Sequence, residues 1–137
     1  MRKKIVFYVF LLISFTTQCI AQNAQIDSIK KVLSVAKEDS LKVNSLLALS
    51  KEFFSASPQE AINYATEAKV LAEKLHYRSG LAYAYKNIGI GYYMQADYVE
   101  SLGNYDKSLA IFYSLEDKVD VANILSNVAS IYFNQAD

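Results

Sequence analysis

The sequence predicts an all-α fold in which antiparallel helix pairs repeat along the chain. Helix-breaking residues are scarce, because the 137 residues include one proline and four glycines, whereas 53% of the residues are apolar. The chain is also self-similar, since residues 87–97 and 127–137 share five of eleven amino acids at an offset of 40 residues. Small and large residues alternate at helical spacing in both copies. These observations favour stacked helix pairs over a β-sandwich.

The first 21 residues are typical of a secretory signal peptide. Three basic residues at positions 2–4 precede an apolar stretch over residues 5–15, and small residues at positions 19 and 21 favour cleavage before Gln22. The apolar stretch is shorter than the roughly 20 residues that a membrane-spanning helix needs, so cleavage is favoured over an uncleaved membrane anchor. A signal that ends in Ala-Gln suggests a Gram-negative bacterium, and we therefore expect the mature chain in the periplasm.

The mature chain lacks the features of several functional classes. Removal of three of the 14 basic residues with the signal peptide, against 14 acidic residues, leaves a net charge of about −3, which disfavours nucleic-acid binding. Cys19 is the only cysteine and lies in the signal peptide, so we expect no disulfide, thiolate metal site or cysteine catalysis. His76 is the only histidine, and its place at a predicted helix end favours a structural role.

No motif for catalysis is recognisable. The chain has no glycine-rich phosphate loop, no metal-ligand spacing and no Ser/His/Asp set. We therefore predict no catalytic, cofactor-binding or metal-binding residues, no cofactor and no enzymatic activity in this chain.

Helical periodicity and capping residues predict six helices. Ser57, Pro58 and Glu60 form a predicted capping box for the helix over residues 58–76. Asp97 and Asp117 are the predicted N-caps of the helices over residues 98–115 and 118–135. Gly103 lies inside a predicted helix at a cost of roughly 1 kcal/mol relative to alanine, which we attribute to close helix packing. The predicted helices cover residues 25–38, 41–55, 58–76, 79–96, 98–115 and 118–135.

The first predicted helix carries apolar residues on one face only. Ile26, Ile29, Leu33 and Ala36 recur there at helical spacing. We therefore expect residues 22–39 to form an N-terminal capping helix that covers the exposed end of the repeat array.

The repeated segments resemble the tetratricopeptide repeat (TPR). In that family the first helix of each unit places a large residue, a Leu-Gly pair and a tyrosine at fixed spacing, and the second helix alternates small and aromatic residues. The first-helix matches are Leu46, Leu49, Ser50 and Phe53 in unit one, Tyr85, Ile88, Gly89 and Tyr92 in unit two, and Leu125, Val128, Ala129 and Tyr132 in unit three; the second-helix matches are Ala61, Ala65 and Ala68, then Ser101, Tyr105 and Ser108.

The resemblance implies a right-handed solenoid of antiparallel helix pairs over residues 40–137, with about two and a half units. The spacing of 40 residues exceeds the usual 34, so we expect longer turns near residues 76–80 and 114–118. Tyr92, Tyr105 and Tyr132 fall on packing positions of the repeat. The third unit stops after its first helix, which predicts an uncovered apolar face formed by Val128, Ile131 and Tyr132. Further repeats or another chain would cover this open face.

In the TPR family the first helices of successive units line a concave groove that binds peptides. Asn87 and Asn127 are the strongest candidates, because an amide can donate to and accept from a partner's backbone; the alternative is that both bond within their own unit. Only Lys51 and Lys86 supply cations, so the arrangement that clamps a C-terminal carboxylate in some family members is not reproduced. The candidate groove residues are Asn44, Lys51, Phe54, Tyr83, Lys86, Asn87, Ile90, Tyr93, Asn123, Asn127, Ser130 and Asn134.

Two functions are compatible with these observations. The first is an extracytoplasmic scaffold that binds a protein or peptide in the groove. The second is the N-terminal input region of a signalling protein such as a sensor histidine kinase or a transcriptional regulator, because similar exported repeats occur in TPR input regions of sensor kinases. In either case we expect membrane contact only through an uncleaved signal or a missing C-terminal part.

Overall fold

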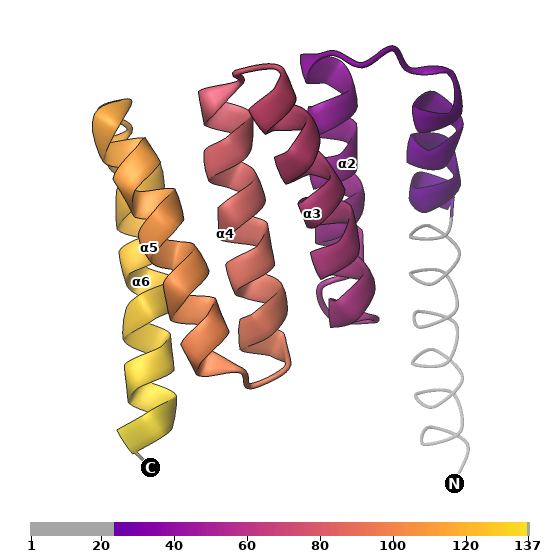
Figure 1. The fold of residues 1–137 in the computed structure, drawn as a ribbon. Helices are drawn as coiled ribbons and strands as arrows, with labels where there is room; N and C mark the ends of the chain where they lie inside the picture. The colour runs from indigo at the N-terminus through magenta and orange to yellow at the C-terminus, as the bar shows by residue number, and fades with distance from the viewer. Residues whose placement is uncertain (1–23, 137) are drawn as a thin grey trace, which may run out of the picture.

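The described part of the chain is built from helices that lie side by side in chain order, each antiparallel to the next (Figure 1). The computed structural model describes residues 24–136, so the predicted signal peptide over residues 1–21 lies outside the described residues. Within the described range there is no strand, which confirms the all-α prediction. A helical segment over residues 24–35 is followed by α2 (Ser40–Glu52), α3 (Pro58–Lys74), α4 (Arg78–Met94), α5 (Tyr98–Ser114) and α6 (Lys118–Ala136).

The last three turns share one length and one shape. Each has a single residue with positive φ at its centre, namely His76 (52°), Ala96 (59°) and Glu116 (56°). The amide of the following residue bonds to a carbonyl five residues earlier, as from Tyr77 to Ala72 at 2.8 Å, and this is the bonding pattern of a Schellman motif. Helices of 17 residues and turns of three therefore alternate every 20 residues.

This regularity explains the 40-residue spacing. We expected longer turns near residues 76–80 and 114–118, and this prediction was wrong. The turns are short, and the helices α3, α4 and α5, each 17 residues long, account for the spacing instead.

Capping side chains fix where most helices begin. Asp97 accepts a hydrogen bond from the amide of Glu100 (3.3 Å) and Asp117 from that of Asp120 (3.1 Å), which confirms both predicted caps. Ser57 precedes Pro58 at the start of α3, but its side chain makes no capping bond, so the predicted capping box is not formed. Asp39 caps α2 in the same way as the other aspartates.

Small residues lie where consecutive helices approach each other. Ala61, Ala65 and Ala68 of α3 are fully buried, as are Ser101 and Ser108 of α5. The serine hydroxyls also donate across the contact, from Ser101 to the Gly89 carbonyl and from Ser108 to the Ala82 carbonyl, both at 2.8 Å. In the first pair the bond runs the other way, from Ser50 of α2 to the Ala61 carbonyl of α3 (2.9 Å). The predicted small positions of the repeat are thus the positions of close contact.

The large residues between these contacts form the core. Tyr105 is 1% exposed and packs with Phe112, Ile124 and Ile131, which confirms its predicted packing role. Tyr92 is half-buried against the small cluster of Ile62, Ala65 and Ile88.

The predictions for α6 were only partly right. Tyr132 falls on a packing position of the repeat but is 59% exposed, as predicted for the uncovered face, because no helix among residues 24–136 covers that side of α6. Ile131 is fully buried and Val128 is half-buried, so they do not belong to the uncovered face; both pack toward the core beside Tyr105.

The helical segment over residues 24–35 lies beside α2 at one end of the row (Figure 1). Ile26, Ile29 and Leu33, with Ala36 just after the segment, are its half-buried positions, and Leu33 packs against the core of the first helix pair. Gln25 bonds to Glu52 of α2 at 2.9 Å. The apolar stripe predicted for this helix therefore faces the repeat units. Nowhere in the described range is a helix both long and apolar enough to cross a bilayer.

Two glycines of the second unit provide a matched stability test. A Cβ at Gly89 would lie 2.7 Å from the Tyr105 ring, whereas a Cβ at Gly103 would meet nothing within 4 Å, so close packing does not explain Gly103. We expect Gly89→Ala to lower the free energy of unfolding by about 2 kcal/mol through overpacking and Gly103→Ala to raise it by about 1 kcal/mol through helix propensity. Urea denaturation of both variants measures this, and equal effects would contradict the assigned helix contact.

The left-handed turn residues provide a second test. Ala96 pays a steric cost at positive φ that glycine avoids, so we expect Ala96→Gly to raise the free energy of unfolding by roughly 0.5–1 kcal/mol. The same substitution at Ala110, which is exposed inside α5, should lower it by about 1 kcal/mol. Thermal unfolding of the two variants separates these outcomes; destabilisation by both would show that the turn is unstrained.

Candidate partner-binding groove

The first helices of the three units, α2, α4 and α6, are joined by side-chain contacts. Tyr77, just before α4, donates to Asn44 of α2 (3.4 Å). On the other side of α4, Asn134 of α6 donates to the Tyr93 hydroxyl at 2.9 Å. Residues from three helices are thereby brought onto one face, as the groove prediction requires.

The strongest of these contacts is an ionic cluster around Asp120 in the first turn of α6. Asp120 is 7% exposed and accepts hydrogen bonds from Lys86 (2.6 Å) and from Tyr83, both on α4. Tyr83 and Lys86 lie on the same face of α4 because they are three positions apart along the helix. Lys86 also lies 5.6 Å from the centroid of the Tyr83 ring, which adds a cation–π contact. The cluster ties the third unit to the second.

The cluster changes the acid–base properties of its members. Burial raises the pKa of Asp120, but hydrogen bonds from Lys86 and Tyr83 and the lysine charge lower it more, so the net pKa lies below the ordinary aspartate value. The pKa of Tyr83 is raised to about 12, first by its hydrogen bond to Asp120 and then by burial and the nearby negative charge. At neutral pH Asp120 is therefore a carboxylate and Tyr83 a neutral phenol.

The first depression of the groove lies where α2 and α4 meet the start of the described chain. Its volume is about 440 Å3. Three predicted residues line it, Asn44, Lys51 and Tyr83, together with Gln25, Leu47, Ala48 and Glu52. Lys51 and Glu52 have opposite charges, so the depression carries little net charge.

The second depression lies between α4 and α6 and has a volume of about 470 Å3. Tyr93, Ser130 and Asn134 are the predicted residues in its lining, and Ser126, Ala129 and Phe133 complete it. None of these residues is Asp, Glu, Lys, Arg or His. The groove thus offers hydroxyl, amide and aromatic groups in place of charges.

Asn87 does not belong to the accessible surface. It is 1% exposed, and its amide donates to the Leu47 carbonyl of α2 at 3.2 Å. The prediction that Asn87 offers its amide to a partner was therefore wrong, and so was the alternative of a bond within its own unit, because Leu47 belongs to the preceding unit. Its location follows from the close approach of α2 and α4, which a single-helix pattern does not reveal.

The remaining predicted residues serve the groove less directly. Asn127 is half-buried and hydrogen-bonded to Tyr105, whose pKa is raised to about 12, chiefly by burial. Asn123 is exposed and hydrogen-bonds to Asp120. Ile90 is half-buried against the core, and Phe54 is half-buried in the turn after α2. Of the twelve candidates, six line the two depressions.

Sequence reasoning missed Asp120, which links the start of α6 to Tyr83 and Lys86 of α4. The sequence contains a signal that could have identified it. Tyr83 and Lys86 are three positions apart on one predicted helix, and an acidic residue lies in the first turn of the predicted helix over residues 118–135, the first helix of the following unit. His76 is exposed in a turn with φ of 52°. Among residues 24–136, no three His, Cys, Asp or Glu side chains are grouped to hold a metal ion.

The lowered pKa of Asp120 predicts a pH-dependent loss. We expect Asp120→Asn to reduce the free energy of unfolding by about 2 kcal/mol at neutral pH, because two hydrogen bonds to a buried charge are weakened. Because the pKa of Asp120 is lower in the folded than in the unfolded chain, its ionised form stabilises the fold at pH values above the unfolded-state pKa. This stabilisation is lost as the pH falls through the folded-state pKa, so the difference between variant and wild type should shrink below about pH 4. Urea denaturation across pH measures it, and exposed Asp106→Asn is the control. A difference independent of pH would contradict the ionic assignment.

Comparison of the chain with protein-family models, with curated proteins and with solved structures finds no match.

Proposed function

We propose that the chain is a TPR-like scaffold that binds an extended, uncharged peptide segment of another protein along α2, α4 and α6. The observation that carries this proposal is the pair of depressions, of about 440 and 470 Å3, on the face of the first helices. A depression of this size accommodates one or two side chains of a peptide. Two such depressions on one face suit an extended segment that places a side chain in each.

The lining chemistry supports a peptide ligand. Asn44, Tyr93 and Asn134 present groups that can donate and accept hydrogen bonds, which is what a peptide backbone requires. Aromatic surfaces at Tyr83, Tyr93 and Phe133 supply apolar contact. The combination resembles a recognition surface in which polar groups fix the orientation and aromatic groups contribute most of the affinity.

The charge distribution supports an uncharged segment. Lys86 is paired with Asp120, and Lys51 lies beside Glu52 in the lining of the first depression. A C-terminal carboxylate or a phosphate group would therefore find no unneutralised cluster of cations to bind. A neutral stretch rich in small or aromatic side chains is the better match.

The proposed scaffold is an exported protein without catalytic activity. The signal-like sequence over residues 1–21 supports export, and we propose that the scaffold acts in the periplasm. The stacking of helix pairs through small residues supports a right-handed TPR-like arrangement, and we propose no catalytic role for the chain.

A groove-filling experiment tests the proposal. Peptides are selected against the wild-type protein from a random display library, and their affinities are measured by fluorescence anisotropy. Ser130→Trp should fill the second depression and Asn44→Trp the first, because both residues are exposed on the groove face. We expect each variant to bind the selected peptides at least tenfold more weakly, which corresponds to about 1.4 kcal/mol.

Ala110→Trp is the matched control, since Ala110 is exposed on α5 and lines neither depression. It should bind the peptides with wild-type affinity. Circular dichroism of all three variants checks that they fold. Peptides that bind the two groove variants as tightly as the control would show that the groove is not the site.

A further inference from the structure

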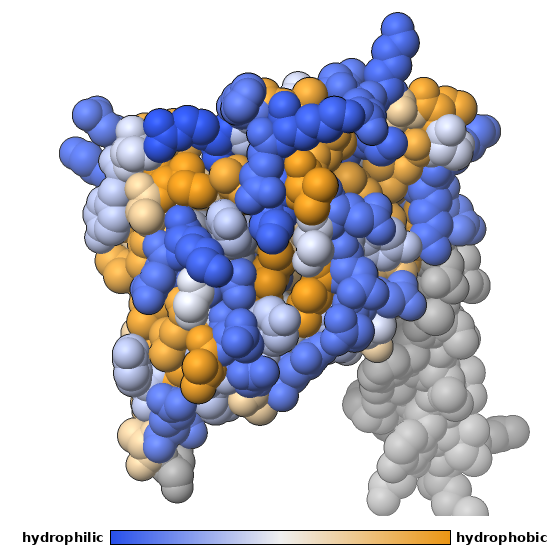
Figure 2. All heavy atoms as spheres, viewed as in Figure 1, coloured by the Kyte–Doolittle hydropathy of each residue, from blue (hydrophilic) through white to orange (hydrophobic). Residues whose placement is uncertain are grey.

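The exposed side of α6 carries an apolar stripe that borders the second depression, whose lining includes Ala129. Ala122, Leu125, Ala129 and Tyr132 recur along it at helical spacing, and all four are exposed. An offset of 40 residues relates them to Ala82, Tyr85, Gly89 and Tyr92 of α4, the side of α4 that α5 covers. Within the described residues nothing covers the stripe on α6. Figure 2 shows hydrophobic surface over α5 and α6 at the left of the view, alongside hydrophilic side chains.

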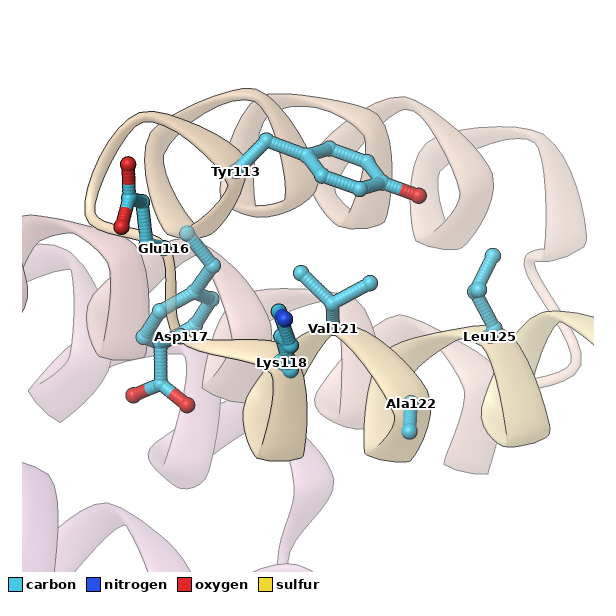
Figure 3. Close-up of a pocket in the computed structure, with 8 residues that line it drawn as sticks. Tyr113, Glu116, Asp117, Lys118, Val121, Ala122 and Leu125 are labelled. Atoms are coloured by element: carbon cyan, nitrogen blue, oxygen red, sulfur yellow. The ribbon is translucent and has the colours of Figure 1, made fainter.

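A depression lies next to the stripe, between the end of α5 and the start of α6. It has a volume of about 540 Å3 and is lined mainly by Phe112, Tyr113, Val121, Ala122 and Leu125. Figure 3 shows Val121 and Leu125 pointing from α6 into the gap, with the ring of Tyr113 extending over them from α5. Tyr113 is 59% exposed. The depression can therefore receive a large apolar side chain from outside.

We propose that two copies of this chain associate through an antiparallel pairing of their α6 helices. The stripe is complementary to itself. If a two-fold axis passes beside Asn127, Ala122 of one copy lies level with Tyr132 of the other, and Leu125 lies level with Ala129, because residues are spaced evenly along both helices. Each large residue then meets a small one.

The covering helix inside the molecule follows the same rule. On α5, which covers α4, the small contact residues Ser101 and Ser108 are seven positions apart. On α6, Ala122 and Ala129 have the same spacing. The α6 helix of a second copy thus has small residues at the same spacing as α5, the helix that covers the equivalent side of α4. Tyr132 and Phe133 of one copy come level with Ala122 and Val121 of the other, which brings both aromatic side chains over the depression.

Charge and area agree with this pairing. No Asp, Glu, Lys, Arg or His occurs over residues 121–136, so a two-fold contact brings no like charges together. Tyr132 and Phe133 are 59% and 71% exposed, and Leu125 is 46% exposed. With Tyr113 and the alanines, we estimate that the pair buries roughly 1,200 Å2 in total, the lower end of specific interfaces, so we expect a reversible dimer.

Molar mass in solution tests the pairing. Sedimentation of the purified protein over a range of concentrations should reveal a reversible shift from one chain to two. Leu125→Glu should remove the dimer because it places two carboxylates near the axis, and Tyr132→Ala should weaken it at least tenfold. Val70→Glu is the matched control, since Val70 is 58% exposed on α3, and should dimerise as the wild type does. A monomer at every concentration, or dimers unaffected by the α6 substitutions, would overturn the proposal.

Disulfide trapping tests the register. Cys19→Ser is introduced first, so that each chain carries a single engineered thiol. Leu125→Cys chains are mixed with Ala129→Cys chains and oxidised. The antiparallel register predicts the mixed disulfide in clear excess over the two homodisulfides. An excess of homodisulfides, which a parallel pairing would give, contradicts the proposal. Its failure leaves the groove proposal intact, because peptide binding is measured separately.

Discussion

The close approach of consecutive helices at small residues is the constraint on which the rest of this structure depends. Ser101 and Ser108 have no room for larger side chains, and their hydroxyls replace solvent for the carbonyls of Gly89 and Ala82. A hydrogen bond of this kind fixes the axial position of one helix relative to the other as well as the distance between them. The large residues Tyr105 and Phe112 then fill the remaining space on either side. Groove, core and uncovered stripe all follow from this register.

Much of the fold could be predicted because its determinants are local. The 40-residue offset, the aspartate caps and the buried alanines of α3 each depend on residues near one another in sequence. Asn87 could not be placed, because its burial depends on α2 approaching α4 across 40 residues of sequence. Tyr132 falls on a packing position of the repeat and was also expected on an uncovered face; it is exposed, because a packing position is buried only when a neighbour covers it. The length of the turns was misjudged because left-handed residues other than glycine leave no clear mark in the sequence.

About half of the candidate groove residues could be identified from helical spacing alone. Asn44, Lys51, Tyr83, Tyr93, Ser130 and Asn134 line the two depressions. The electrostatic character of the groove could not be predicted, because it depends on which partner each lysine finds. Asp120 pairs with Lys86 across two helices, and this pairing supports the proposal that the surface binds neutral ligands. One carboxylate thus joins α6 to α4 and also lowers the charge of the surface beside them.

Packing in chain order has a further consequence for how the molecule folds and opens. Contacts join mostly neighbouring helices, so the relative contact order is low, and folding can nucleate in any pair and spread along the row. Among the described helices, α6 has neighbours on one side only, and the bonds of Asp120 to Tyr83 and Lys86 help to hold it in place. The local stability of the last helix, and with it the lifetime of the second depression, is therefore coupled to a single buried charge.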